Sequence, residues 1–461
     1  MKKFFITTPI YYVNDLPHIG HAYTTVAADV LARFYRNLGH KVYFLTGTDE
    51  HGVKIELAAK RRGVSTKKFT DTVADSYKDN WRVLNISNDY FIRTTDANHK
   101  KEVGNFLNIL YKKGVIYKGI YEGLYCVGHE KFLTGDEIVA GKCPEHHTKP
   151  VPYRELNYFF KLSSFQKELT KIISGGEIEI TPTKRKNEVL GKLKQGLEDI
   201  SISRESLHWG IPLPFDKSQT TYVWVDALIN YLTYGKEQKV WPADLHLIGK
   251  DILWFHAVIW PALLLAVGYE LPKKIFAHGF FTIEGEKMSK SLDNVISPKD
   301  LVARFGVDGT RFLLLSIFTF GEDGNISLKL FKEKYNKELA NGLGNTVSRI
   351  TKLASTTTLI LPKSGKNNFD PKFVEVIESL SFEKALKIPF NLLASLNSDI
   401  DKDKPWNLKG RGLKKVLETY IEKLLLIATY LEPFMPETSQ KIKKQFSSSK
   451  IKSILPIFPR Q

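Results

Sequence analysis

Residues 3–39 read KFFITTPIYYVNDLPHIGHAYTTVAADVLARFYRNLG, and this stretch decides the fold. The apolar, β-rich run Lys3–Thr8 stops at Pro9 and predicts a short buried strand. From Ala22 to Leu38 apolar residues recur every four positions, which marks one face of a helix, and Gly39 is a good stop. The stretch therefore predicts a strand, a loop and a helix, the opening unit of an α/β sheet.

The same alternation of strands and helices continues along the chain. It breaks off at about residue 115, where shorter periodic segments and both cysteines occur, and it resumes at about residue 220. One sheet divided by an insertion explains this better than two separate sheets, so the sequence predicts a Rossmann-type parallel sheet split by an inserted connective module. Expected strands are 41–46, 221–225, 245–248 and 274–277, and expected helices are 53–84, 96–113, 226–234 and 252–267.

Beyond about Ser297 no strand pattern recurs, and helical patterns cover 328–353, 372–401 and 413–430. An all-α C-terminal domain is the simplest account. We therefore expect four regions: 1–114, the first half of the catalytic sheet; 115–219, the connective insertion; 220–325, the second half with a lysine-rich loop; and 326–461, the helical domain.

The composition favours a soluble protein with a polyanionic partner. Lys and Arg number 67 and Asp and Glu 50, a net charge of +17, although a basic surface can also serve solubility alone. Two cysteines fit a reducing compartment. The N-terminal apolar run is too short for a signal peptide, and 252–268 falls short of a membrane span. We expect a cytoplasmic protein with no membrane partner.

Two short motifs point to phosphate chemistry. His18–His21 (HIGH) falls where the first loop becomes a helix, and a helix N-terminus attracts anions. Lys287–Ser291 (KMSKS) follows an expected tight turn at Gly285, and its two lysines suit a leaving pyrophosphate. Alone, the first motif also reads as two solvated histidines and the second as a solvated loop. Together at the ends of one sheet they indicate an ATP site.

In this order and separation, the motifs resemble the signatures of the class I aminoacyl-tRNA synthetases. Residues 8–21 and 46–52 (TGTDEHG), with 222–227 (YVWVDA) and 249–256 (GKDILWFH), resemble the methionyl-tRNA synthetases of the short bacterial type in particular. The resemblance covers nearly the whole chain. It implies a methionine–tRNA ligase, which converts methionine and Mg-ATP to methionyl-adenylate and then charges tRNA(Met).

The resemblance also implies roles for individual residues. The catalytic ATP-handling groups would be His18, His21, Lys287 and Lys290, and the nucleotide would also meet Gly20, Gly249, Asp251, His278 and Gly279. Asp49 would hold the substrate ammonium, although a helix cap is the plain structural alternative. The methionine pocket would comprise Ile10, Tyr12, Trp224, Ala227, Leu228, Tyr231, Ile252, Phe255 and His256, of which Leu228 and Ile252 also read as core. Tyr12 or His256 would hydrogen-bond the sulfur.

The insertion carries two Cys-x-x-His pairs whose spacing suits tetrahedral Zn²⁺. They resemble the family's zinc knuckle and would supply Cys126, His129, Cys143 and His146, with His147 as a competitor for His146. His129 stands where cysteine is the commoner ligand, so a relic knuckle without metal is the alternative. We expect a structural zinc ion.

The helical domain resembles the family's anticodon-binding domain. Asn345 and Arg349 lie four apart on one predicted helix face, and Trp406 supplies an exposed-looking ring that could also be a packing residue. Such residues suit unpaired anticodon bases. The chain ends soon after this domain, without the dimerising module that some members append, so we expect a monomer.

Other functions fit the sequence less well. The nearest alternative is a class I synthetase for Cys, Leu, Ile or Val, but the large aliphatic enzymes need a long editing insertion and this one has only about 100 residues. A tRNA-binding paralogue without catalysis would not need both ATP motifs and Asp49. A small nucleotidyltransferase would lack the lysine loop and the helical domain.

Overall fold

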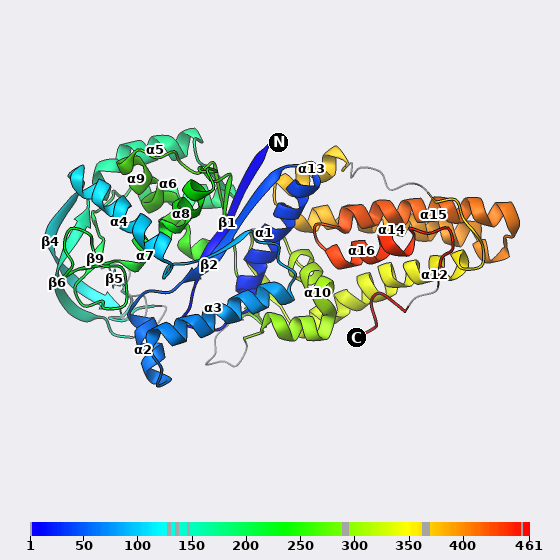
Figure 1. Cartoon of the computed structure of the whole chain (residues 1–461), viewed down its shortest axis with the longest axis horizontal. Coiled ribbons are helices and arrows are strands. Elements are labelled where there is room, and N and C mark those ends of the chain that lie inside the picture. The colour runs from blue at the N-terminus through cyan, green and yellow to red at the C-terminus, as the bar shows by residue number, and fades with distance from the viewer. Residues whose placement is uncertain are drawn as a thin grey trace.

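The computed structural model describes residues 2–126, 131–133, 138–144, 148–287, 295–361, 369–452 and 455–461. A six-stranded sheet lies at the centre of the larger, N-terminal part of the molecule (Figure 1). Its strand order is β3-β2-β1-β11-β12-β7, and every pair is parallel. The predicted Rossmann-type parallel sheet is confirmed. The strands are β1 Lys3–Tyr12, β2 Lys41–Asp49, β3 Tyr90–Arg93, β7 Glu179–Thr181, β11 Leu245–Gly249 and β12 Lys274–His278.

Helices cover both faces of this sheet, as parallel strands require. The first of them, α1 (Ile19–Asn37), begins directly after the first loop, as predicted. It is followed by α2 (Val53–Arg61), α3 (Thr66–Val83) and α4 (Ala97–Lys112) and, in the second half, by α7 (Val223–Leu228), α8 (Asn230–Glu237) and α9 (Trp260–Val267). Two tighter or wider helical segments, the 3₁₀ turn η3 (Lys250–Ile252) and the π-helix η4 (Phe255–Ile259), lead into α9.

The strand predicted at Thr221–Val225 is wrong. β10 comprises Thr220–Thr221 and pairs with β9 (Ser203–Arg204), and α7 already begins at Val223. Val223 and Val225 are both buried on this short helix. A helix that is apolar all round carries no 3.6-residue signal, so a short β-branched run cannot be told from a strand by its pattern.

The segment between the two halves forms a second, antiparallel sheet. β4 (Ile116–Cys126) pairs with β5 (Lys131–Leu133) and along its length with β6 (Val151–Phe160), which also pairs with β8 (Ile200–Ser201). The 3₁₀ turn η2 (Leu162–Phe165), α5 (Gln166–Gly175) and α6 (Thr183–Leu193) follow β6. Between these two helices the chain also supplies β7, the edge strand of the main sheet. The domain boundaries stay a prediction.

The expectation of no strand beyond Ser297 is also wrong. β15 (Gly324–Ile326) pairs with β13 (Phe281–Ile283), which forms a hairpin with β14 (Glu286–Lys287). β15 has three residues, too few to show a period of two. The predicted tight turn before the lysine motif is confirmed, because Glu284 and Gly285 both have positive φ, at 54° and 90°.

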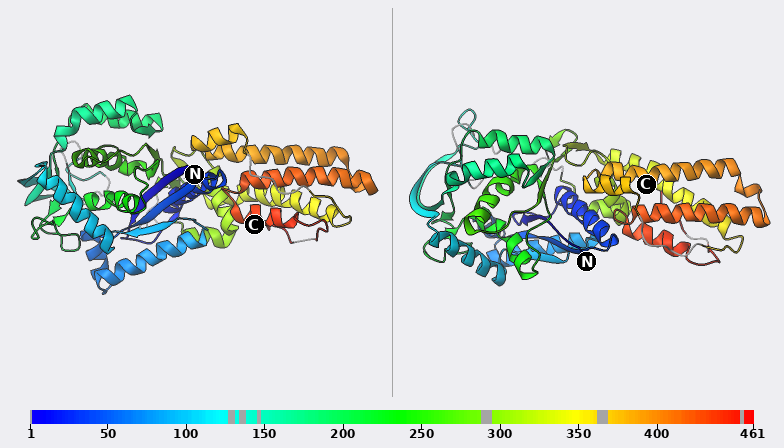
Figure 2. Two further views of the ribbon diagram at one scale, coloured as in Figure 1. Left: turned by 45° about the horizontal axis from the view of Figure 1, so that its top comes forward. Right: turned by 90° about the horizontal axis from the view of Figure 1, so that it is seen from above.

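The C-terminal part is helical and extends from one end of the sheet along the long axis of the molecule (Figures 1 and 2). A single buried apolar cluster runs from β1 and α1 into these helices, so the two parts share one core. No helix among the described residues is long and apolar enough to cross a membrane. The elements are α10 (Pro298–Ser316), α11 (Leu328–Lys334), the π-helix η6 (Tyr335–Gly344), α12 (Asn345–Ala354), α13 (Pro371–Glu378), α14 (Phe382–Asp403), the 3₁₀ turn η7 (Pro405–Asn407), α15 (Gly410–Leu431) and α16 (Pro436–Gln445).

Candidate active site

A cavity of about 460 Å³ opens at the carboxyl ends of β1, β2, β11 and β12. Parallel sheets bind ligands at this edge, because the polar loops that follow the strands meet there. The cavity brings together most of the residues predicted to form the site: Ile10, Tyr12, His18, Gly20, His21, Asp49, Trp224, Ala227, Leu228, Tyr231, Gly249, Asp251, Ile252, His256, His278 and Gly279.

Among the predicted cavity residues whose side chains the structure describes, only Phe255 does not line the cavity. Phe255 packs behind the lining, with its ring stacked on Trp224 at a centroid separation of 4.0 Å and an interplanar angle of 13°. Lys287 is the last residue of β14, and Lys290 lies outside the described residues.

The two histidines of the first motif cap α1 and each other. Nδ1 of His18 accepts the Gly20 N–H at 3.1 Å, and Nδ1 of His21 accepts the His18 N–H at 3.2 Å, an arrangement equivalent to a capping box. Because a backbone N–H can only donate, each neutral ring carries its proton on Nε2. The two rings stack at 3.8 Å. Both therefore offer an Nε2–H in the cavity that they line.

Burial keeps these rings uncharged. It lowers the pKa of His18 to about 4, with Asp15 opposing the shift, and it lowers the pKa of His21 well below its usual range, with His18 adding to the shift. At neutral pH the first motif therefore contributes two neutral donors and a helix N-terminus, not two positive charges.

His278 ties the end of β12 to α1. Its Nδ1–H donates to the Gly279 carbonyl at 2.7 Å, and its Nε2 accepts the Thr24 hydroxyl at 2.7 Å. Burial lowers the pKa of His278 to about 4, against the opposing effect of the Gly279 bond. Both ring nitrogens are thus engaged within the protein, which leaves the Gly279 backbone beside it as the flat floor of the cavity.

Two glycines lie in close packing at this edge. A Cβ on Gly279 would lie 2.4 Å from the backbone carbonyl of Glu322, so this position needs glycine. A Cβ on Gly249 would lie 2.7 Å from Oδ1 of Asp251, the end of a flexible side chain that would have to move aside. Gly249 thereby lets the Asp251 carboxylate fold back over the end of β11.

The apolar end of the cavity is held by an internal hydrogen-bond chain. Nδ1–H of His256 donates to the Ile252 carbonyl at 2.9 Å, so Nε2 is an acceptor and takes the Tyr231 hydroxyl at 2.8 Å. Burial lowers the pKa of His256 to about 4, so the ring is neutral. The N–H of His256 is thus engaged within the protein, and the hydrogen bond from Tyr12 or His256 to a sulfur atom stays a prediction. The π-helix η4 places this ring, and such segments are frequent at functional sites.

Asp49 is the last residue of β2 and lines the cavity, in register with Tyr12 of β1. Its backbone carbonyl accepts the Val13 N–H at 3.0 Å, which fixes the strand end. The side chain is buried, and a buried carboxylate beside a cavity favours a cationic ligand group.

Comparisons with a family model, with curated relatives and with solved structures all lead to one family. Residues 4–151 and 146–351 match the family described as tRNA synthetases class I (M). A methionine–tRNA ligase of Caldanaerobacter subterraneus subsp. tengcongensis is 44% identical over 471 residues, covering 96% of this chain and 74% of the relative. That of Rickettsia felis is 43% identical, with 97% and 93% covered. A Mycobacterium tuberculosis methionyl-tRNA synthetase structure with methionyl-adenylate has a TM-score of 0.92 at 35% identity and full coverage of both chains.

The chain belongs to the methionyl-tRNA synthetase family. The predicted enzyme class, a class I methionine–tRNA ligase, is confirmed. The alternatives of another amino acid, of a paralogue without catalysis and of a nucleotidyltransferase have no support from these matches.

A buried polar anchor behind the methionyl-tRNA synthetase cavity was not predicted from the sequence. Asp226 on α7 is fully buried and accepts hydrogen bonds from His51 at 2.6 Å and from His99 at 2.8 Å. Burial on its own raises the pKa of this carboxyl, but His51 and His99 outweigh burial and hold it below the usual value. The three side chains come from three distant segments, so no spacing in the sequence connects them. They fix the helix that carries Trp224.

Other lining residues escaped prediction although their neighbours were found. The cavity also takes Pro9, Tyr11, Tyr23, Thr24, Lys54, Val223, Phe280 and Phe281. The hydroxyls of Tyr11 and Thr25 share a hydrogen bond of 2.7 Å, and the Tyr11 ring stacks on Tyr77. Most of these residues adjoin a predicted motif, and their alternation with predicted residues along β1 was the available signal.

The three residues predicted to bind the anticodon lie on the helical part. Arg349 of α12 pairs with Asp401 of α14 at 3.2 Å, and Trp406 follows in η7 with 54% of its surface exposed. Asn345, the first residue of α12, is also exposed. The ion pair joins the two helices just before the exposed ring.

Two of the four predicted zinc ligands lie together. Cys126 and Cys143 are buried in one small cluster with Leu133, and the Cys143 N–H donates to the Thr148 carbonyl at 2.9 Å. His129 and His146 lie outside the described residues. Among the residues that the structure describes, no three His, Cys, Asp or Glu side chains gather as a metal site would require.

Proposed function

We propose that this cavity joins L-methionine to the α-phosphate of Mg-ATP and then passes the methionyl group to tRNA(Met). The observation that carries the proposal is the meeting, in one cavity, of two neutral Nε2–H donors at a helix N-terminus with a buried carboxylate and an aromatic pocket. The two Nε2–H donors at the helix N-terminus suit phosphate oxygens. The buried carboxylate and the aromatic pocket suit the ammonium group and the side chain of an apolar amino acid.

In the first step a methionine carboxylate oxygen attacks the α-phosphorus, and the bond to the bridging oxygen breaks, which releases pyrophosphate and forms methionyl-adenylate. His18 and His21 donate to the phosphate oxygens as charge builds up on them, and the α1 N-terminus adds to this field. Lys287 and Lys290 are proposed to stabilise the leaving pyrophosphate. Because no protein bond forms, positioning and charge stabilisation supply the catalysis.

The nucleotide is proposed to lie against the two glycine-bounded turns of the cavity. Its adenine would rest on Gly20 and against His278 and Gly279, where the backbone is bare, and its ribose would bond to Asp251 after the Gly249 turn. A Cβ on Gly279 has no room, and one on Gly249 would displace the Asp251 carboxylate, so glycine at these two positions supports a flat surface for a ring.

Methionine is proposed to lie between Asp49 and the aromatic end. Asp49 would bind its ammonium, and the side chain would enter the pocket of Ile10, Tyr12, Trp224, Ala227, Leu228, Tyr231, Ile252 and His256, with Phe255 behind Trp224. The Tyr231 hydroxyl donates to Nε2 of His256, and Nδ1–H of His256 donates to the Ile252 carbonyl, so the hydrogens of both side chains are engaged within the protein. A polar side chain that needs donors would stay unsatisfied there, which favours a thioether.

In the second step the hydroxyl of the terminal adenosine of tRNA attacks the methionyl carbonyl, and AMP leaves. Asn345, Arg349 and Trp406 are proposed to bind the anticodon bases, by hydrogen bonding and by stacking. Asn345 and Trp406 are exposed and Arg349 is half-buried on these elements of the helical part, which supports this assignment.

We also infer a structural zinc ion beside the second, antiparallel sheet, near the end of β4. The two buried thiols of Cys126 and Cys143 fit half of a tetrahedral Zn²⁺ set, and His129 and His146 would complete it. Metal analysis of the purified protein and of Cys126→Ser tests this proposal, and equal zinc content in both would contradict it.

A monomer in the cytoplasm is proposed as well, and light scattering at micromolar concentration would reveal a dimer.

The test of the proposed function is amino-acid-dependent ATP–pyrophosphate exchange across a panel of amino acids. Methionine should support exchange almost alone, and Asp49→Asn should raise the KM for methionine about 10–100-fold, since a hydrogen bond to a charged group contributes about 1.5–3 kcal/mol. Exchange with a different amino acid would overturn the substrate, and an unchanged KM would overturn the role of Asp49.

A further inference from the structure

Arg311 of α10 is a fully buried arginine at the junction between the sheet and the helical part. Its guanidinium donates to three backbone carbonyls: Nη1 to Leu84 at 3.2 Å, Nη2 to Pro433 at 3.0 Å and Nε to Phe434 at 2.8 Å. Nη2 also pairs with Asp29 of α1 at 2.7 Å. One side chain thus joins α1, the end of α3 and the turn between α15 and α16.

The Asp29 end of this junction belongs to the catalytic helix. Asp29 lies eight residues after His21 on α1, which is about 12 Å along the helix axis. Besides Arg311 it accepts from Arg33 at 2.7 Å and from the Ser87 N–H at 2.7 Å. Burial alone raises the pKa of this carboxyl, but the two guanidinium groups outweigh burial and hold it below the usual value. The carboxylate therefore stays charged and bound to Arg311.

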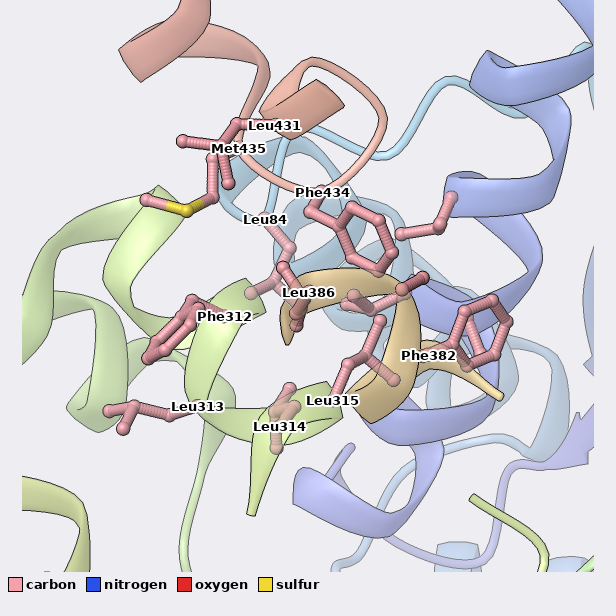
Figure 3. Packing of buried hydrophobic residues seen from close by; sticks show 14 of the residues in the cluster. Leu84, Phe312, Leu313, Leu314, Leu315, Phe382, Leu386, Leu431, Phe434 and Met435 are labelled. Carbon is pink, nitrogen blue, oxygen red and sulfur yellow. The ribbon is translucent and has the colours of Figure 1, made fainter. Parts of the chain in front are cut away.

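The other end of the junction holds the helical part. Asp308, one turn before Arg311 on α10, accepts the Thr438 N–H in the first turn of α16 with its Oδ2. Apolar residues from α10, α14, α15 and the turn that follows α15 pack around this turn, among them Phe312, Leu386, Leu431 and Phe434 (Figure 3). Two polar side chains of α10 thus fix the α15–α16 turn, on either side of an apolar contact.

Apolar packing alone would hold these helices together. A buried charged pair gives little net stability over well-packed apolar residues, but its directional bonds fix one relative arrangement. The planar guanidinium group donates to four acceptors at once and thereby fixes their positions relative to one another, which neither lysine nor an apolar residue can do. The Arg311 bonds therefore determine how the helical part is oriented relative to α1 more than whether it is attached.

We propose that Arg311 is a positioning residue for tRNA charging: it fixes the helical part relative to α1, so that a tRNA bound there delivers its acceptor end to His18, His21 and the adenylate. The inference rests on the proposed function, because it requires that the helical part binds the anticodon. Methionine activation needs only the cavity, whereas charging needs the cavity and the helical part in register. Replacing Arg311 should therefore separate the two steps.

The test compares Arg311→Lys with Arg33→Met. Lysine keeps the charge for Asp29 but cannot reach the separated carbonyls together. Arg33 is a matched control, because it binds the same carboxylate and its other hydrogen bonds to described residues go to Asn85. We expect Arg311→Lys to keep methionine-dependent pyrophosphate exchange within about twofold and to lower kcat/KM for tRNA charging about tenfold or more. Arg33→Met should not separate the two rates.

An RNA minihelix that carries the acceptor stem but no anticodon distinguishes positioning from damage. Because it does not contact the helical part, the minihelix should be charged equally by the wild type and by Arg311→Lys. A variant that loses exchange, minihelix charging and tRNA charging alike would show that Arg311 is merely structural, and a variant that loses none would also overturn the proposal. If Arg311→Lys does not fold, Asp308→Ala, which removes the hydrogen bond to the Thr438 N–H of α16, must give the same separation.

The proposed function is checked separately by the wild-type chain. If the wild type does not charge tRNA(Met), the proposed function fails whatever the variants do. If it charges tRNA(Met) while Arg311→Lys and Asp308→Ala charge it at the same rate, the role of Arg311 alone fails.

Discussion

The imidazole of His18 lies on that of His21, with the ring centroids 3.8 Å apart and each Nδ1 bound to a backbone N–H of the same turn. The two rings thus complete the start of α1 and at the same time keep their Nε2–H groups for a ligand. Nδ1 of each ring thus bonds within the fold, whereas Nε2–H is the group proposed to bind the substrate. A substitution can therefore remove one function and keep the other.

His18→Asn should make this separation. The amide oxygen of asparagine can take the place of Nδ1 and accept the Gly20 N–H, and asparagine is a favoured N-cap, so the thermal stability should change by less than about 1 kcal/mol. The Nε2–H is lost, and methionine-dependent pyrophosphate exchange should fall about 10²–10³-fold in kcat, as when one oxyanion donor is removed. Exchange and thermal unfolding measure the two effects, and an active His18→Asn would contradict the donor role.

Tyr231→Phe should weaken methionine binding. It removes the hydroxyl that His256 Nε2 accepts, and because Nδ1–H is held by Ile252 the ring cannot turn its lone pair elsewhere. An unsatisfied buried acceptor costs about 1–3 kcal/mol. We expect the KM for methionine in pyrophosphate exchange to rise about tenfold with a smaller change in kcat.

Tyr158→Phe is the control for this prediction. Tyr158 lies on β6 of the antiparallel sheet, where its hydroxyl donates to Asp216 at 3.0 Å, and it is not among the residues that line the cavity. It should leave the KM for methionine unchanged. Equal KM values for Tyr231→Phe and the wild type would show that the hydrogen bond to His256 does not shape the pocket.

Gly279→Ala should disrupt the nucleotide side of the cavity. The new Cβ would lie 2.4 Å from the Glu322 carbonyl, so the chain at 322–323 must move. Asp323 moves with it, although it binds Lys250 at 2.6 Å and the Phe280 N–H at 2.8 Å. The KM for ATP should rise at least about tenfold and the melting temperature should fall.

Gly104→Ala is the matched control, because Gly104 lies within α4 with no atom close to its Cβ position. Alanine should stabilise this helix by up to about 1 kcal/mol and leave exchange unchanged. A Gly279→Ala protein with the wild-type KM for ATP would show that the 322–323 segment yields without affecting the site.

The parallel sheet and the cavity could be predicted because their signals are local. Period, Gly stops and polar residues after apolar runs lie within a few residues of one another, as in residues 3–39. The helix α7 could not be predicted, because burial on all sides removed its period and left a β-branched run.

The buried polar groups could not be predicted for a different reason. Asp226, His51 and His99 are brought together by the topology, and each alone reads as a solvated residue in a loop or a helix. Arg311 likewise stands before an apolar run of α10, where an arginine usually faces water. Only tertiary contact shows that these charges are paired, so sequence reasoning found the cavity and missed what holds it in place.

Stability should fall as the pH is lowered from 6.5 towards 4. Burial lowers the pKa of His18, His256 and His278 to about 4 and holds the pKa of His21 and His246 well below its usual range, whereas in the unfolded chain all five titrate near 6.5. Between these values the unfolded state binds more protons, so this stability is fully present above pH 6.5 and is lost below it.

Each of these histidines contributes a slope of up to about 1.4 kcal/mol per pH unit, which urea unfolding at pH 7, 6 and 5 would measure. His246→Asn removes one of these titrating groups, so the slope should become shallower by up to about 1.4 kcal/mol per pH unit. The variant should still fold, because the amide oxygen can accept the Thr7 hydroxyl, which lies 2.7 Å from Nδ1 of His246. Carboxylates such as Asp29 and Asp226, whose pKa values are lowered, lose their contribution only below about pH 4, outside this window. A free energy of unfolding that stays constant from pH 7 to 5 would mean that the histidines are not buried in their neutral form.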